Sequence, residues 1–171
     1  SFFRIGRIVF ENKSYSSAKN CFNYIIEKST LNEEKIEAYL YISKIYIATK
    51  NPETETLFQS LFHQFGKNPS TIKLQVEYAD FLTFQENKPK LAKQILEHAL
   101  TFSQSKFNEA KIKLKLGDIL VFTGKYNKAL IYFSQIQSKL KNHELAQQAR
   151  FKVAQTSYFK GDFTWAKAQL K

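Results

Sequence analysis

Few residues of this 171-residue sequence could carry out catalysis or bind a metal ion. Histidine is the usual acid–base group and metal ligand near neutral pH, and the three histidines are His63, His98 and His143. They fall at unrelated positions of the repeat described below, so nothing brings them together as ligands or as an acid–base pair. The single cysteine, Cys21, stands beside Phe22 with no histidine nearby, which indicates a small buried residue.

Sequence motifs of enzymes are absent as well. There is no glycine-rich phosphate-binding loop, no Gly-x-Ser-x-Gly and no His-Glu-x-x-His. The only aspartates are Asp80, Asp118 and Asp162, so paired carboxylates would have to come mostly from surface glutamates. We therefore expect no catalytic activity, no cofactor, no metal ion and no small-molecule substrate.

The chain is organised as an internal repeat of 37 residues. The segment "GKYNKALIYF" begins at Gly124 and "GDFTWAKAQL" begins at Gly161, a separation of 161 − 124 = 37 residues. Steps of the same length give a column of small residues with one exception, Ala18, Glu55, Ala92, Ala129 and Ala166. A second column has residue types that tolerate left-handed turns, Lys13, Lys50, Asn87, Gly124 and Gly161. A third column contains further glycines, Gly6, Ser43, Asp80, Gly117 and Ala154. Such agreement over successive steps indicates a repeat architecture.

Each copy of the repeat predicts two helices joined by a short turn. Apolar residues recur at helical spacing in "IEAYLYISKIYIA", and Pro52 can begin the second helix of that copy. The predicted helices are near 2–11, 15–28, 36–48, 73–86, 89–102, 107–122, 126–140, 144–159 and 163–171, with one more from Pro52. No stretch alternates in the manner of a strand, so we expect no β-sheet. One array over residues 1–171 is predicted, with units near 1–33, 34–70, 71–107, 108–144 and 145–171, the first and last incomplete.

The repeat resembles the tetratricopeptide repeat over essentially the whole chain. The residues that carry the resemblance are clearest in "LGDILVFTGKYNKALIYFSQI", namely Leu116, Gly117, Gly124, Tyr126, Ala129 and Phe133. The copy around residues 39–65 departs from the pattern, with Pro52 in place of an aromatic and Glu55 in place of alanine. The resemblance implies an all-α, right-handed α-solenoid of antiparallel helix pairs. It also implies a non-catalytic scaffold for protein–protein interaction within a multiprotein assembly.

The resemblance places the partner-binding groove on the first helices of the pairs. The residues expected there are Arg4, Arg7, Tyr41, Lys44, Tyr78, Phe81, Lys115, Asp118, Lys152 and Gln155. Two apolar columns beside them either line the groove or pack between helices: Phe3, Leu40, Glu77, Leu114 and Phe151, and Phe10, Ile47, Phe84, Val121 and Tyr158. Some tetratricopeptide repeat domains bind the acidic C-terminal tail of a chaperone through a clamp of Lys, Asn and Arg side chains. This sequence departs from that pattern at the corresponding positions. We expect an amphipathic helix or an extended apolar segment of a partner protein, with Tyr78 and Phe81 as anchors whose removal leaves the fold intact.

The formal net charge of +11 suggests an alternative, an electrostatic binder of nucleic acid or of another anionic partner. The arginines are only Arg4, Arg7 and Arg150, so most of the positive charge belongs to lysine, which makes poorer bidentate phosphate contacts. The run "KIKLKL" scatters its lysines around a helix, which favours a solvated face. Lys115 and Lys152 share a column and are the candidates for an electrostatic site.

Composition sets the remaining bounds. No apolar run approaches the roughly 18 residues that a membrane-spanning helix needs. The sequence contains no methionine, and it opens and closes inside a repeat, so we expect it to be part of a longer chain. Lysine- and asparagine-rich arrays of this type are common in bacterial envelope and assembly machinery, and by analogy the resemblance favours that setting over the cytoplasm.

Overall fold

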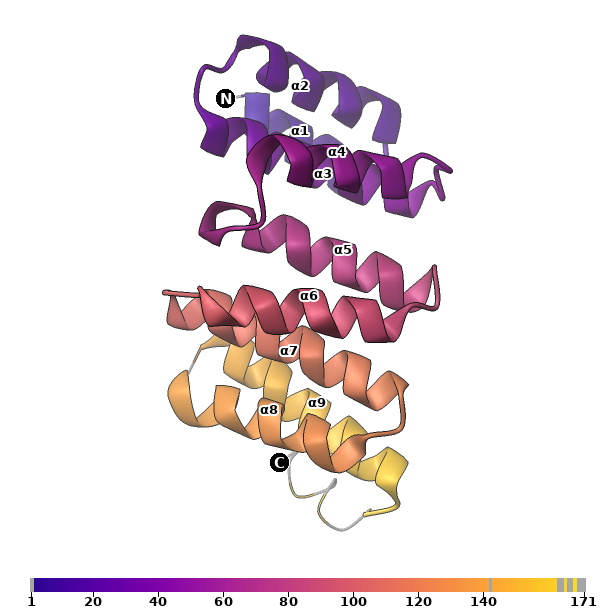
Figure 1. The fold of residues 1–171 in the computed structure, drawn as a ribbon, viewed down its shortest axis with the longest axis vertical. Helices are drawn as coiled ribbons and strands as arrows, with labels where there is room; N and C mark the ends of the chain where they lie inside the picture. The colour runs from indigo at the N-terminus through magenta and orange to yellow at the C-terminus, as the bar shows by residue number, and fades with distance from the viewer. Residues whose placement is uncertain (1, 142, 163–164, 166–167, 169–171) are drawn as a thin grey trace. The chain divides into compact units, whose positions relative to one another are not determined.

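The computed structural model describes residues 2–141, 143–162, 165 and 168, and it is all helical apart from turns (Figure 1). The helices are α1 (Phe2–Glu11), α2 (Tyr15–Lys28), α3 (Asn32–Ala48), α4 (Thr54–Phe65), the short 3₁₀ helix η1 (Pro69–Thr71), α5 (Ile72–Phe84), α6 (Pro89–Thr101), α7 (Lys106–Phe122), α8 (Tyr126–Lys139) and α9 (Glu144–Lys160). These residues contain no strand, as the sequence predicted. The helix predicted over 163–171, with Ala166, falls largely outside the described residues.

The predicted helices agree closely with the observed ones, except at the starts of α3 and α4. The sequence placed the start of α3 near Ile36, whereas α3 begins at Asn32. It placed the start of α4 at Pro52, whereas α4 begins at Thr54. The two preceding residues form a turn, in which the Asn51 side chain accepts a hydrogen bond from the backbone of Glu53 at 2.8 Å. The Thr54 hydroxyl donates to the Asn51 carbonyl oxygen at 2.6 Å. These two bonds stabilise the turn that precedes α4.

The turn inside each helix pair has the conformation that the glycine-containing column predicted. All five residues of this column have positive φ: Lys13 (60°), Lys50 (51°), Asn87 (52°), Gly124 (72°) and Gly161 (89°). Only glycine enters this region without a steric penalty, which explains its presence at two of these positions. The recurrence of one backbone geometry every 37 residues confirms that the sequence repeat is also a structural repeat.

The chain divides into two compact units, residues 1–78 and 79–171. The division falls within α5, which is continuous from Ile72 to Phe84. The first unit contains α1 to α4 and the start of α5, and the second contains the end of α5 and α6 to α9. The single array over residues 1–171 stays a prediction.

The second helix of a pair packs on both of its neighbours through small and large residues in alternation. In the second unit, Ala129, Phe133 and Ile136 of α8 share a buried cluster with residues of α7 and α9. Ala129 and Phe133 are fully buried. A methyl group at Gly117 of α7 would overlap the ring of Phe133, so glycine allows α7 and α8 to approach this closely.

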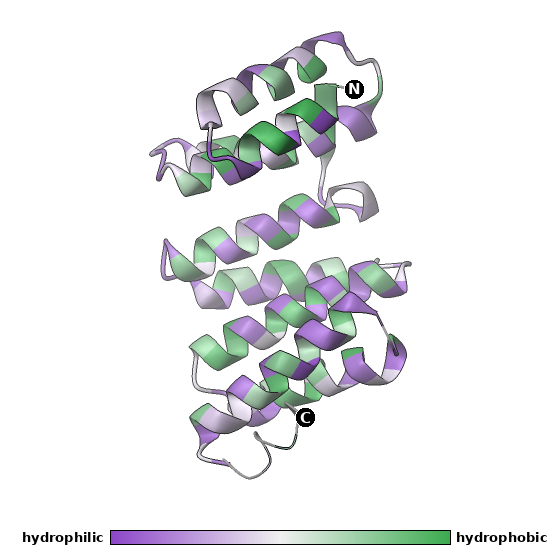
Figure 2. Ribbon diagram, turned by 180° about the vertical axis from the view of Figure 1, so that it is seen from behind, coloured by the Kyte–Doolittle hydropathy of each residue, from purple (hydrophilic) through white to green (hydrophobic). Residues whose placement is uncertain are grey.

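The first unit repeats this packing with the equivalent residues. Ala18 and Phe22 of α2 are fully buried and pack with Ile42 and Ile45 of α3. Gly6 of α1 lies against the Phe22 ring as Gly117 lies against Phe133. In Figure 2, hydrophobic and hydrophilic residues mix along each helix, as expected of helices that bury one face. None of the described helices is long and apolar enough to cross a lipid bilayer.

Substitution of Ala129 by leucine tests the close packing of α8. Ala129 has no exposed surface, so the larger side chain must push helices apart, and we expect Ala129→Leu to lower the free energy of unfolding by about 1–3 kcal/mol. Denaturant unfolding followed by circular dichroism measures this change. Ser134→Leu is the matched control, because Ser134 is exposed on the same helix. If both variants unfold at the same denaturant concentration, the small-residue column does not form a tight helix contact.

Candidate functional site on the first helices of the pairs

Ion pairs connect successive first helices in the second unit. Lys152 of α9 and Asp118 of α7 are 2.8 Å apart (Nζ to Oδ1), and only 13% of the Asp118 side chain is exposed. Lys115 of α7 pairs in the same way with Asp80, which belongs to the end of α5. These pairs join helices that are not adjacent in sequence. The lysines that were candidates for an electrostatic site therefore have carboxylate partners.

The Asp80 carboxylate lies in a partly desolvated position. Its side chain is 27% exposed, and it occupies the column that holds Gly6 and Gly117 in other first helices. Burial raises the pKa of Asp80 above its usual value of 3.8, and the attraction of Lys115 offsets this effect only in part. The ionised aspartate is thus held at some cost in free energy, despite its lysine partner.

A row of exposed aromatic side chains lies one turn beyond these ion pairs. Phe84 and Phe122 stand four residues after Asp80 and Asp118, and so lie on the same faces of α5 and α7. Their rings make an edge-to-face contact with 5.4 Å between centroids. They remain 53% and 49% exposed, which is unusual for phenylalanine. On α9 the equivalent end carries Tyr158 and Phe159, exposed by 60% and 52%.

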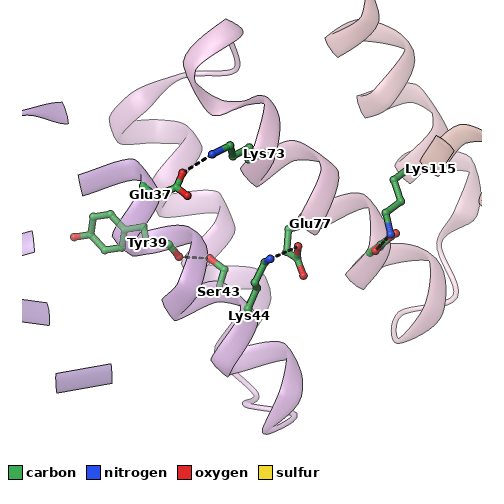
Figure 3. A network of polar contacts seen from close by, with 8 residues as sticks. Glu37, Tyr39, Ser43, Lys44, Lys73, Glu77 and Lys115 are labelled. Atoms are coloured by element: carbon green, nitrogen blue, oxygen red, sulfur yellow. Dashed lines mark hydrogen bonds and ion pairs between the residues drawn. The ribbon is translucent and has the colours of Figure 1, made fainter. Parts of the chain in front are cut away.

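The first unit has ion pairs of the same kind between α3 and α5 (Figure 3). Lys73 donates to Glu37 at 2.8 Å, and Lys44 lies 4.0 Å from Glu77. The Ser43 hydroxyl donates to the Tyr39 carbonyl oxygen at 2.9 Å within α3, so this residue stays inside its own helix. A charged network between first helices is therefore present in both units.

Two residues predicted to contact a partner belong to the packed interior. Tyr78 and Phe81 are each only 6% exposed. The Tyr78 ring packs against Phe58 and Phe62 of α4, with centroids 4.8 and 5.6 Å away. The prediction that both could be removed without loss of the fold is corrected by this burial, because truncation of a buried aromatic residue costs about 3–5 kcal/mol.

The other predicted groove residues are accessible to different degrees. Arg4 and Arg7 are exposed on α1, and Gln155 is exposed on α9. Tyr41 is half-buried, because its ring stacks on Phe22 with centroids 4.7 Å apart. Lys44, Lys115, Asp118 and Lys152 are the ion-paired residues described above. The structure thus gathers most of the charged predicted residues into ion pairs within each unit and leaves Arg4 and Arg7 unpaired with any described residue.

Sequence reasoning missed part of the exposed aromatic row. Phe84 and Tyr158 belong to one of the two apolar columns that could line the groove or pack between helices, whereas Phe122 and Phe159 lie outside every column predicted for the groove. Their signal was present in the sequence, because both lie in the column that starts at Glu11 and continues through Ala48 and Gln85. Three polar or small residues in this column indicate a solvent-facing position, where a phenylalanine is conspicuous.

The residue types that could carry out chemistry have structural roles. His143 caps α9, where its Nδ1 accepts a hydrogen bond from the backbone of Leu145 at 3.1 Å. His63 and His98 lie on α4 and α6, and Cys21 is half-buried on α2. Among the described residues, no group of three or more histidine, cysteine and acidic side chains could hold a metal ion.

Comparison with known proteins agrees with this architecture. Residues 110–138, which include most of α7 and of α8, match the family model described as Tetratricopeptide repeat. These residues are a tetratricopeptide repeat, and the chain has the tetratricopeptide repeat fold. The fold is an all-α solenoid of antiparallel helix pairs. A comparison with curated proteins finds no match.

Solved structures extend the likeness of fold to nearly the whole chain. A structure of PilF from Pseudomonas aeruginosa superposes with a TM-score of 0.72 at 15% sequence identity, covering 98% of this chain and 71% of that one. A thermophilic TPR protein of Thermus thermophilus gives 0.67 at 16% identity, covering 97% and 84%. A Rap protein in complex with Competence and Sporulation Factor gives 0.78 at 17% identity, covering 98% of this chain and half (50%) of that chain. At these identities the likeness concerns the fold.

The tetratricopeptide repeat fold is that of a protein-interaction scaffold, and proteins of this family are generally not catalytic.

The substitution Asp80→Asn tests whether burial of the ionised Asp80 carboxylate lowers the stability of the folded protein. Folding raises the pKa of Asp80, so the folded protein binds the proton of this carboxyl group more tightly than the unfolded chain does. The ionised aspartate therefore lowers the stability of the folded state as pH rises through the folded pKa. Between about pH 4 and pH 7 we expect the stability of the parent to fall relative to Asp80→Asn. Denaturant unfolding at several pH values measures the difference.

Lys115→Met is the paired control for this measurement. It leaves the partly buried carboxylate without its cation, and so should cost more stability at neutral pH than Asp80→Asn does. If the parent instead gains stability over Asp80→Asn as pH rises, the ion pair outweighs the cost of burial.

Proposed function

We propose that this chain is a scaffold that binds an amphipathic helix or an extended apolar segment of a partner protein along the first helices of its second unit. The observation that carries the proposal is the exposed row of Phe84, Phe122, Tyr158 and Phe159. Large aromatic side chains gathered on one surface mark interaction sites on soluble proteins, because they bury much area with little loss of rotamer entropy.

The ion pairs beside the aromatic row suit such a partner. Both signs of charge are present in the Asp80–Lys115 and Asp118–Lys152 pairs. Partly exposed pairs of this kind can orient polar groups at the edge of an apolar contact, whereas the aromatic row provides the affinity. The Rap protein neighbour, solved in complex with Competence and Sporulation Factor, supports the view that this fold accommodates a bound partner.

Selection of peptide ligands tests this function without knowledge of the natural partner. Helical and extended peptides displayed on phage would be selected on the parent chain and then measured by fluorescence anisotropy. We expect Phe84→Ala with Phe122→Ala to weaken their binding by about 2 kcal/mol or more, roughly 30-fold, because aromatic anchors dominate such contacts. Both rings are half-exposed, so circular dichroism should show an intact fold.

Ile131→Ala is the matched control. Ile131 is 58% exposed on α8, a second helix, so its truncation removes exposed apolar surface away from the aromatic row. Peptides that lose affinity to Ile131→Ala but not to the phenylalanine pair would place the site on the second helices and contradict the proposal.

Binding of nucleic acid provides a separate test. Lys44, Lys115 and Lys152 already face carboxylates, so these three lysines are less available for phosphate contacts than exposed lysines without such partners would be. We expect RNA and DNA to bind only in the nonspecific range of about 10⁻⁴ to 10⁻⁶ M, with a steep decrease as salt rises. Filter binding at several salt concentrations measures this. Nanomolar affinity at physiological salt would favour the electrostatic alternative.

A further inference from the structure

Two exposed turns adjoin the aromatic row in the second unit, one after α5 and one after α7. In the first turn, the backbone N–H of Lys88 donates to the Leu82 carbonyl oxygen at 2.7 Å. In the second, the backbone N–H of Lys125 donates to the Leu120 carbonyl oxygen, also at 2.7 Å. Each turn therefore folds back on the end of its first helix, where an exposed phenylalanine of the row stands. Figure 1 shows both turns on the same side of the second unit, and the two phenylalanine rings contact each other.

Positive charge exceeds negative charge along this edge, which comprises residues 84–91 and 121–128 and is named the turn edge. Its only acidic residue is Glu86. Its four lysines are Lys88, Lys90, Lys125 and Lys128. The equivalent segments of the first unit, 10–17 and 47–54, each contain one lysine, one glutamate and no exposed aromatic residue. Exposed rings and excess positive charge thus occur together at the turn edge.

Lys125 and Lys128 can contact a partner without breaking an existing ion pair. Both are exposed, and neither pairs with a carboxylate of any described residue. Lys125 is the N-cap of α8 and Lys128 is the third residue of this helix, two positions whose side chains lie close together. Lys88, in contrast, already lies 3.4 Å from the Glu86 carboxylate (Nζ to Oε2). Lys125 and Lys128 are therefore the cations that a partner would meet beside the aromatic rings.

We propose that the partner segment bound at the aromatic row is acidic as well as apolar. Its apolar side chains pack on Phe84 and Phe122, and its carboxylates face Lys125 and Lys128. This inference rests on the proposed function, because it names the chemistry of the partner at that same site. Complementary charge at the rim of an apolar contact speeds association and disfavours partners of the wrong charge. A second copy of this chain is a poor occupant, because both copies would carry a formal net charge of +11.

Selection from a charge-balanced peptide library tests this chemistry. The library would display helical and extended peptides with fixed apolar positions, and with glutamate, lysine or glutamine in equal proportion at the other positions. We expect the selected peptides to contain more glutamate than lysine, because carboxylates complement the turn edge. The selected peptides would then be synthesised and measured by fluorescence anisotropy.

Charge reversal at the start of α8 tests the position of the contact. We expect Lys125→Glu with Lys128→Glu to weaken the binding of the selected acidic peptides by about tenfold or more, because two attractions become repulsions. Acidic residues are favourable at a helix N-terminus, so the reversal should leave α8 folded, which circular dichroism checks.

Lys111→Glu with Lys141→Glu is the matched control. This double variant changes the net charge by the same amount, and both lysines are exposed. Lys111 lies in the first half of α7 and Lys141 follows the end of α8, so both are remote along their helices from the turn edge. We expect the control to weaken binding by less than about twofold, because solvent screens charges at such separations.

The outcomes separate this inference from the function on which it rests. Selected peptides without an excess of glutamate, or equal losses in the two double reversals, would overturn the inference, whereas the proposed function stands if Phe84→Ala with Phe122→Ala still weakens binding. If the phenylalanine pair has no effect, both fail. Vesicles containing phosphatidylserine that bind the parent more tightly than the peptides do, and lose this binding in Lys125→Glu with Lys128→Glu, would assign the turn edge to a lipid surface and contradict the inference.

Discussion

The close approach of two helices around a buried aromatic ring is the interaction on which the rest of this structure depends. Phe133 fills the space opposite Gly117, and Phe22 does the same opposite Gly6. Only a residue without a side chain, or a very small one, lets the helix axes come near enough for the ring to be enclosed. Each helix pair is thereby fixed as a structural unit. The pair still has an exposed apolar face, and in a repeat protein the next pair covers this face.

Regular stacking of pairs brings polar residues of successive first helices within reach of one another. Asp118 and Lys152 are 34 positions apart in sequence, nearly one repeat, and form an ion pair at 2.8 Å. Asp80 occupies a position that holds glycine in α1 and α7, and its partial burial there raises its pKa. Such partly buried pairs add little net stability, because the cost of desolvation offsets much of the attraction between the charges.

The same regularity makes departures from it informative about binding. Phe122 and Phe159 are informative in this way, because they place aromatic rings in a column otherwise occupied by polar or small residues. This feature does not depend on a catalytic motif, which is consistent with a scaffold.

Local sequence determined the helices, the turns and the repeat. The turn residues Lys13, Lys50 and Asn87 and the glycines of their column could be recognised because a left-handed turn restricts residue type at a single position, independent of distant contacts. The helix bounds followed from apolar periodicity, and they were wrong at two starts. Helix α3 begins at Asn32, before the apolar pattern that predicted it, and α4 begins two residues after Pro52. Before α4, hydrogen bonds of the Asn51 and Thr54 side chains stabilise a turn.

The tertiary structure alone decided which side of each first helix is accessible. Tyr78, Phe81, Phe84 and Phe122 are all aromatic residues on first helices, yet the first two are buried and the last two are exposed. Burial depends on which helix packs against each face, and the apolar periodicity of a single helix does not specify its neighbours.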